Sequence, residues 1–324
     1  MARLLLIAAG AGALAGCTQT ASSDPVAPPS QAAPRQAAPR QAAPKQAAEP
    51  APPPAASATF SSDQYAEHVQ RLRERLRAKQ LGHLSVRIED PFVVAGDGTP
   101  EQLARSSQTV RWAADKLEQG FFAHRPAKIL DVFLFQTAEG YEHGVQALTG
   151  SAPTTPFGFY SSSHGGLFMN ISTGGGTLVH EIVHPYVEAD FPGAPPWLNE
   201  GLGSLFEQSS ERNGDIVGLT NWRLAGLQRA IERGAVPSFR ALTRLDSDGF
   251  YNDDRGINYA QSRYLLYYLQ EQGLLRDFYR AFRAGRAKDP TGYATLLQSL
   301  GERERDMDRF QERWERYVAG LRFP

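Results

Sequence analysis

The chain has 324 residues, and its 34 basic and 35 acidic side chains give a net charge of −1 at pH 7. Nucleic-acid-binding proteins carry clustered basic charge or a phosphate-cradling loop, and neither occurs here, so we predict that nucleic acid is not a partner. The single cysteine, Cys17, excludes a disulfide bond within the chain.

Residues 1–17 predict an export signal. Arg3 supplies a positive charge, a short apolar stretch follows, and small residues precede Cys17, in a segment too short to remain as a membrane-spanning helix. Leu14-Ala15-Gly16-Cys17 resembles a bacterial lipobox, which implies that Cys17 carries a lipid and anchors the chain to a membrane. The residue after Cys17 is Thr18 and not Asp, which favours the outer membrane in that pattern. The alternative is an ordinary secretory signal with an incidental cysteine.

Residues 18–59 consist mainly of Ala, Pro, Gln and Ser, with five-residue repeats that begin at Gln31, Gln36 and Gln41. Such a composition offers too little apolar surface for a core and too many prolines for helix or sheet. We therefore expect a disordered tether between the lipid anchor and a domain at 60–324.

The pattern of residues 60–324 predicts an α+β domain. A small mixed sheet is expected in a first lobe at 60–190, and a mostly helical lobe is expected at 191–324. The first lobe should contain a helix from Ser61 or Ser62 to about 80, a strand at 84–94, a helix at 99–119, a strand at 129–135, a helix at 138–148 and strands at 158–160 and 167–171. The second should contain helices at 197–209, 221–233, 258–272, 274–284, 292–300 and 302–319.

A metal-binding pattern follows the last of those strands. His180 and His184 are four residues apart, so on a helix they present two imidazoles to one point. Hydrolytic zinc sites commonly take three protein ligands and leave a fourth position for water, and Glu200 on the next helix is the expected third ligand. Glu181 projects about 100° from His180, toward the open position, where it would act as general base toward the zinc-bound water.

Two features qualify this prediction. Pro185 follows His184 directly and removes one backbone hydrogen bond, which predicts a kink in the helix at the second histidine. The strand at 167–171 leads into the metal helix, and at a sheet edge it could pair with a substrate backbone; the alternative is an internal strand.

The strings Gly176-Thr177-Leu178-Val179-His180-Glu181-Ile182-Val183-His184 and Pro196-Trp197-Leu198-Asn199-Glu200-Gly201-Leu202 resemble the gluzincin metallopeptidases, in particular the bacterial peptidase MA-like group. The resemblance implies a thermolysin-like zincin fold, Zn²⁺ held by His180, His184 and Glu200, and a peptide or protein substrate. Gluzincin aminopeptidases usually carry Gly-x-Met-Glu-Asn before this helix. Residues 166–170 read Gly-Leu-Phe-Met-Asn and lack that Glu, which favours an endopeptidase.

Other residues are weaker candidates. Tyr259 is expected to stabilise the oxyanion, with Tyr251 and His164 as alternatives. Glu207 or an acid near Asp253 could orient a ligating imidazole. The leading hypothesis is a membrane-anchored zinc peptidase; the alternatives are a catalytically weak gluzincin-fold lipoprotein that binds a partner, and an amidase that acts on cell-wall peptides.

Overall fold

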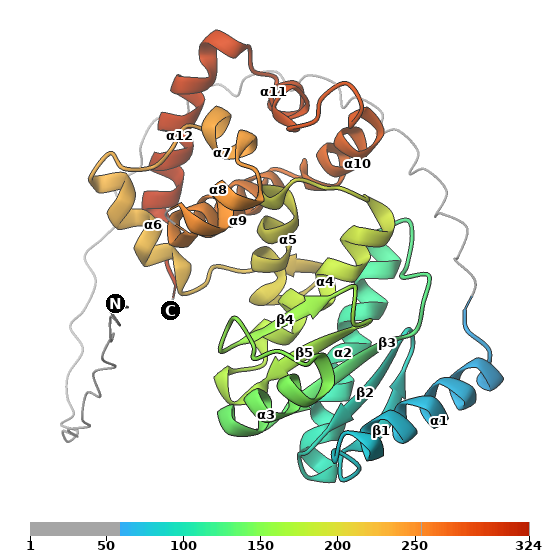
Figure 1. The fold of residues 1–324 in the computed structure, drawn as a ribbon. Coiled ribbons are helices and arrows are strands. Elements are labelled where there is room, and N and C mark those ends of the chain that lie inside the picture. The colour runs from blue at the N-terminus through green and yellow to red at the C-terminus, as the bar shows by residue number, and fades with distance from the viewer. Residues whose placement is uncertain (1–58, 254, 324) are drawn as a thin grey trace, which may run out of the picture. The chain divides into compact units, whose positions relative to one another are not determined.

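A computed structural model describes residues 59–253 and 255–323 of the chain (Figure 1). The predicted signal at 1–17 and all but the last residue of the predicted tether lie outside the described residues.

The first part of the fold is built on a five-stranded sheet in the order β1-β2-β3-β5-β4. The two central pairs, β2 with β3 and β3 with β5, are parallel, and the two outer pairs are antiparallel. The strands are β1 (Ser85–Glu89), β2 (Phe92–Gly96), β3 (Leu130–Phe135), β4 (Gly158–Ser161) and β5 (Gly166–Asn170). The prediction of an α+β domain with a small mixed sheet is confirmed.

The segment predicted as one strand at 84–94 forms the β1–β2 hairpin. Glu89 pairs with Phe92, so the chain reverses direction at Asp90 and Pro91. Proline cannot donate to the ladder and is confined to edges and strand ends, so Pro91 marks the break. The single-strand prediction was wrong because it extended across this residue.

Strand β5 is internal. It lies between β3 and β4, so its backbone is paired on both sides. The hypothesis that 167–171 offers an edge for substrate pairing is therefore wrong, and the strand with an unpaired side in this sheet, next to β5, is β4.

Helices cover both faces of the sheet because each strand sends alternate side chains to opposite faces. Val93 and Phe133 pack in the same cluster as buried side chains of α1 and α3, whereas Val94 and Val132 pack in the larger cluster that contains α2 and α4. The helices are α1 (Ser62–Ala78), α2 (Pro100–Gly120), α3 (Ala138–Thr149) and α4 (Gly176–Asp190), with a 3₁₀ turn at Ile171–Thr173. α2 begins at the predicted capping box, in which Thr99 Oγ1 accepts from Gln102 N at 3.3 Å and Gln102 Oε1 accepts from Thr99 N at 2.8 Å.

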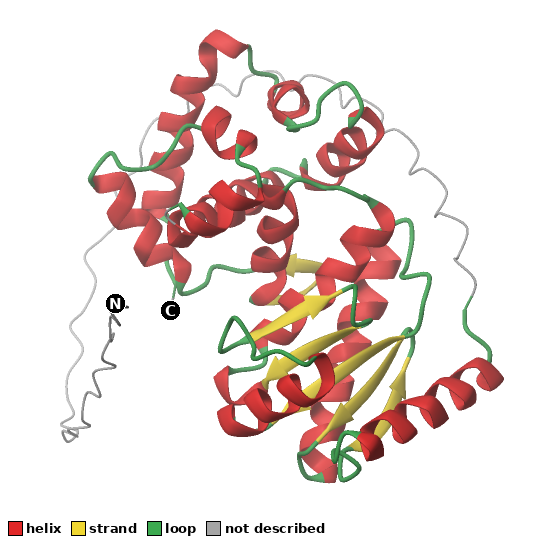
Figure 2. Cartoon of the chain, in the orientation of Figure 1, coloured by secondary structure: helices red, strands yellow, loops and turns green. Residues whose placement is uncertain are grey.

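The second part is mostly helical, as predicted (Figure 2). Its elements are α5 (Pro196–Glu207), β6 (Ser209–Arg212), β7 (Asp215–Gly218), α6 (Arg223–Glu232), α7 (Phe239–Arg244), α8 (Ser247–Asn252), α9 (Arg255–Glu271), α10 (Leu275–Gly285), α11 (Tyr293–Leu300) and α12 (Met307–Gly320). The β6–β7 hairpin and the short helices α7 and α8 were not predicted. The helix predicted from 302 begins at 307, after a 3₁₀ turn at Glu304–Asp306.

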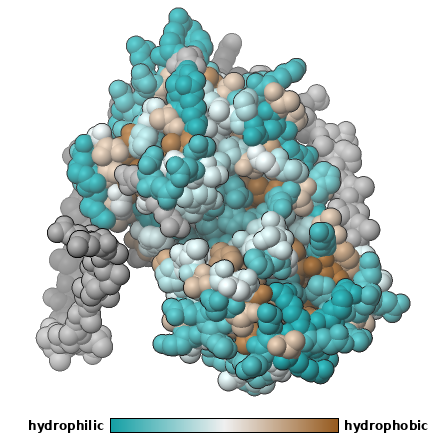
Figure 3. Space-filling model, viewed as in Figure 1, coloured by the Kyte–Doolittle hydropathy of each residue, from teal (hydrophilic) through white to brown (hydrophobic). Residues whose placement is uncertain are grey.

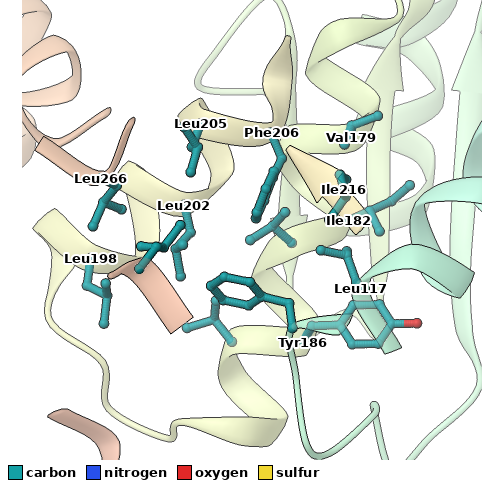
Figure 4. Close-up of a cluster of buried hydrophobic side chains, with 14 of the residues drawn as sticks. Leu117, Val179, Ile182, Tyr186, Leu198, Leu202, Leu205, Phe206, Ile216 and Leu266 are labelled. Atoms are coloured by element: carbon teal, nitrogen blue, oxygen red, sulfur yellow. The ribbon is translucent and has the colours of Figure 1, made fainter. Parts of the chain in front are cut away.

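One side of α4 forms part of the core that joins the two parts (Figure 4). Ile182 and Tyr186 of α4 lie in the same buried cluster as Leu117 of α2 and Leu202 of α5. Burying each such side chain contributes about 1.5–3 kcal/mol, so this packing fixes which side of α4 faces away from the core. α4 continues as a helix through Pro185 to Asp190, so the proline does not end the helix at His184.

Hydrophilic residues cover most of the face seen in Figure 3, with apolar residues in smaller areas between them. In the part of the chain that the structure describes, none of the helices combines the length and the apolar character that crossing a membrane requires.

Candidate metal centre

The first half of the candidate centre lies on α4. The chain leaves β5 through a 3₁₀ turn and turns at Gly174, whose φ of 115° favours glycine, before α4 begins at Gly176. His180 and His184 are then one turn apart, and both are buried, with exposures of 6% and 8%. Potential ligand atoms of His180, Glu181 and His184 all lie within 4.8 Å of one another, so this buried group could hold a metal ion.

Glu200 reaches the same point from α5. Its Oε2 atom lies 3.2 Å from His180 Nε2 and 3.9 Å from His184 Nε2. Ligand atoms placed 2.0–2.2 Å from a tetrahedral zinc ion are separated by about 3.4 Å, and the Glu200 oxygen lies near this distance from both imidazole nitrogens. Glu181 Oε2 is also near, at 3.7 Å from His184 Nε2, but Glu200 has the closer approach to an imidazole.

Two glycines of α5 allow this approach. A Cβ atom at Gly201 would lie 2.9 Å from Leu266 of α9, and one at Gly203 would lie 3.0 Å from His180 Nε2. Contacts this short are rare for real Cβ atoms, so a side chain at either position would require the end of the Leu266 side chain or the His180 ring to shift.

Hydrogen bonds orient two of the proposed ligands. Tyr251 of α8 donates its hydroxyl hydrogen to Glu200 Oε1 at 2.5 Å, which leaves Oε2 directed toward the histidines. His184 Nδ1 lies 3.0 Å from Asn199 Oδ1. When Nδ1 is the donor in that pair, Nε2 carries the lone pair that a metal ion needs.

The charges of this group shift two pKa values. Burial alone raises the pKa of Glu200, but the charge of His184, the hydrogen bond and charge of His180, and the hydrogen bond from Tyr251 outweigh it and lower the pKa to about 2. Burial alone lowers the pKa of His180, but the hydrogen bond to Glu200 and the charges of Glu181, Glu200 and Glu207 outweigh it and raise the pKa. The carboxylates around His180 therefore favour positive charge at this imidazole, and a metal ion bound there in place of the proton would experience the same field.

Glu181 faces the same space as the two imidazoles. It is 7% exposed, and its Oε2 accepts a hydrogen bond of 3.0 Å from the backbone N–H of Tyr160 on β4. This contact fixes the carboxylate between strand β4 and His184, where it can accept a proton from a bound water molecule.

The centre opens into a cavity of about 1160 Å³ between the two parts of the fold. The cavity is lined by strand β4 and the segment before it, by α4, and by residues of α5, α6, α8 and α9. A cavity of this size and lining is large enough for several residues of an extended peptide.

The three candidates for the oxyanion have different positions. Tyr259 and Tyr251 both line the cavity, and the Tyr259 ring lies 6.4 Å from the His180 ring, centroid to centroid. His164 does not: its Nδ1 pairs with the Ser161 hydroxyl at 2.9 Å in the turn after β4.

The acids expected to orient an imidazole have other partners. Glu207 lines the cavity but accepts from Asn221 Nδ2 at 3.3 Å and Arg223 Nε at 3.2 Å, and Asp253 is exposed at the end of α8. Asn199 contacts His184 instead, and sequence reasoning missed it. Its position directly before Glu200 was the signal available for finding it.

A scan of the sequence against protein-family models and a search of curated proteins found no match.

Proposed function

We propose that the protein is a zinc-dependent peptidase of the gluzincin type, in which His180, His184 and Glu200 hold the metal ion and Glu181 is the general base. The observation that supports this most strongly is the approach of Glu200 Oε2 to both Nε2 atoms at 3.2 and 3.9 Å, inside a cavity that also contains Glu181. A thermolysin-like arrangement, with the cleft between a sheet-containing part and a helical part, belongs to the same proposal.

A bound zinc ion supplies a Lewis acid that polarises the scissile carbonyl and makes a water molecule more acidic. Glu181 would accept a proton from the water molecule that attacks the carbonyl carbon and would then deliver this proton to the leaving amine. The backbone N–H of Tyr160 holds the Glu181 carboxylate in place for both transfers. Tyr259 lines the cavity and supplies the hydroxyl that stabilises the developing oxyanion.

The substrate backbone pairs with strand β4. Asn170 N donates to Phe157 O at 2.9 Å, so Phe157 is hydrogen-bonded to β5. Hydrogen-bonded and non-hydrogen-bonded residues alternate along an antiparallel strand. The backbone N–H and C=O of Phe159 therefore face β5, and those of Gly158 and Tyr160 face the free side of β4. Gly158 and Tyr160 line the cavity. The Tyr160 N–H is bonded to Glu181, so the N–H and C=O of Gly158 and the C=O of Tyr160 are the groups within reach of an extended peptide. The unpaired edge therefore favours a peptide over a compact small molecule.

Replacing Glu181 with Gln tests the proposal. Glutamine keeps the size of the side chain but cannot accept the proton, so turnover of a mixed peptide library should fall at least about 100-fold. Zinc content, measured by atomic absorption on the dialysed protein, should stay the same. Cleavage by Glu181→Gln at the wild-type rate would show that Glu181 is not the base, and a wild-type protein that binds zinc but cleaves no peptide would favour the partner-binding alternative.

Export and attachment to a membrane through a lipid on Cys17 remain predictions from residues 1–17, which lie outside the described residues.

A further inference from the structure

A third side chain follows the two histidines along the cavity side of α4. Glu188 lies four residues after His184, so it projects from the same side of the helix one turn later. It lines the cavity and is exposed, unlike the buried His180, Glu181 and His184.

Tyr160 of the edge strand β4 holds the Glu188 carboxylate. Its hydroxyl donates to Glu188 Oε2 at 2.6 Å, while its backbone N–H donates to Glu181 Oε2. Burial and the neighbouring Glu188 raise the pKa of Tyr160, so the hydroxyl remains a donor at neutral pH. One residue therefore positions two carboxylates, and only Glu181 is assigned to the chemistry.

The charge of Glu188 is not balanced within residues 59–253 and 255–323. Among their ion pairs, Glu207 meets Arg223 and Asp190 meets Arg283, but none includes Glu188. A carboxylate has about four acceptor positions, and a single donor from Tyr160 leaves others directed at the cavity. A cation that enters this end of the cavity would find an oriented carboxylate.

We propose that Glu188 binds a cationic nitrogen of the substrate, either the side chain of Lys or Arg or a free α-amine. This inference rests on the proposed function, since it takes the occupant of the cavity to be a peptide.

The position of the charged substrate residue follows from the helix. Glu188 lies about 6 Å along α4 from His184, and an extended peptide advances about 3.3 Å per residue. The cation should therefore belong to a residue within about two positions of the scissile bond. Arg223 also lines the cavity and pairs with Glu207 at 3.2 Å, and the Glu207 backbone lies against Gly176 at the start of α4. The positive charge is therefore at the opposite end of α4 from Glu188, and a basic side chain is favoured at the Glu188 end.

Peptide binding to the zinc-loaded Glu181→Gln protein tests the inference without requiring turnover. The probes are peptides of one sequence in which a single Lys, or its neutral acetyl-lysine counterpart, is moved along the chain, each with a free or an acetylated N-terminus. If Glu188 recognises a side chain, the Lys peptide should bind more tightly than the acetyl-lysine peptide when the Lys stands at one particular position. If it recognises the α-amine, peptides with a free N-terminus should bind more tightly than peptides with an acetylated N-terminus. Adding Glu188→Gln to this protein should lower its affinity for the preferred peptide about five- to tenfold and remove the preference for the charged form.

Two matched variants control for unrelated effects. Glu142→Gln makes the same change at an exposed position of α3 outside the cavity lining and should leave both affinities unchanged. Tyr160→Phe removes the donor to Glu188 and should reduce the preference. Equal binding of the charged and neutral peptides, a preference that survives Glu188→Gln, or no binding of any probe would each overturn the inference. Failure of the wild-type protein to cleave peptides would instead contradict the proposed function. The two failures can be told apart because the binding assay does not depend on cleavage.

Discussion

The two oxygens of Glu200 have separate partners. Oε1 accepts from Tyr251 at 2.5 Å, and Oε2 faces His180 and His184. Without the Tyr251 hydroxyl the carboxylate could rotate, and a freely rotating ligand loses more entropy when it binds a metal ion. Hydrogen bonds to metal ligands typically affect metal affinity by about 10–100-fold.

Tyr251→Phe is therefore expected to weaken zinc affinity about tenfold, measured by competition with a chromophoric chelator. Tyr259→Phe is the matched comparison, because it removes a second tyrosine hydroxyl from the lining of the same cavity, whereas the hydrogen bond to Glu200 Oε1 comes from Tyr251. It should leave zinc affinity unchanged and lower kcat. If Tyr259→Phe weakens zinc binding and Tyr251→Phe does not, the two assignments are reversed.

Gly203 offers a sharper test at the residue scale. A methyl group there would lie 3.0–3.1 Å from atoms of the His180 ring, so Gly203→Ala requires the ring to shift by a few tenths of an ångström. We expect zinc affinity to fall at least about tenfold. Gly226→Ala is the control: it also lies in a helix, no atom lies within 4 Å of the added carbon, and alanine there should stabilise the protein by about 0.5–1 kcal/mol. Unchanged zinc affinity in Gly203→Ala would show that the ring position does not matter.

At the scale of elements, the last residue of α4 joins three segments. Asp190 Oδ1 accepts from the backbone N–H groups of Ala123 and His124 at 3.1 and 2.9 Å, after α2. From α10, Tyr279 donates to Oδ2 at 2.9 Å and Arg283 forms an ion pair with Oδ1. The Asp190 side chain is fully buried, whereas that of Arg283 is 29% exposed.

Asp190→Ala is expected to lower the free energy of unfolding by about 2–4 kcal/mol, because it leaves two backbone N–H groups and the buried Tyr279 hydroxyl without their acceptor. Glu312→Ala, at an exposed position of α12, should change it by less than about 0.5 kcal/mol. Urea denaturation of the metal-free protein measures both. A loss below 1 kcal/mol for Asp190→Ala would mean that the neighbouring segments rearrange to solvate the donors.

Most elements with a strong local pattern were predicted from sequence, with one exception, and elements defined by their partners were not. The capping box at Thr99 and the apolar stripe of α4 fixed two helices correctly. The β6–β7 hairpin was missed although Asn213-Gly214, both with positive φ, is a strong hairpin signal. α7 and α8 have six residues each, too few to reveal a helical period.

The same distinction applies to the candidate site. His180 and His184 were identifiable because helix geometry alone brings residues four apart together. The roles of Tyr251 and strand β4 were not identifiable, because they depend on where distant elements pack. Strand order placed β5 inside the sheet and β4 beside α4, and no local pattern in either strand contains that information.

At the scale of the whole described domain, the candidate ligands connect its two parts. His180 and His184 come from the helix that follows the sheet, whereas Glu200 and its partner Tyr251 come from the helical part. α4 and α5 also share a large apolar contact, so the parts are joined without a metal ion. A bound cation would add a further connection on the cavity side of the same helix pair.

Removing the metal should therefore lower the stability of the whole domain. A ligand that binds only the folded state stabilises it by about 4 kcal/mol at a free concentration 1,000 times its Kd, which for a domain of this size shifts Tm by roughly 10 °C. We expect a drop of this order when the zinc-loaded protein is treated with a chelator, measured by calorimetry, and recovery when zinc is added back. Glu200→Gln, which lacks one charged ligand, should show a much smaller shift under the same conditions. An equal shift in the two proteins would place the zinc at another site, since the Tm response would then not depend on the carboxylate that reaches across from α5.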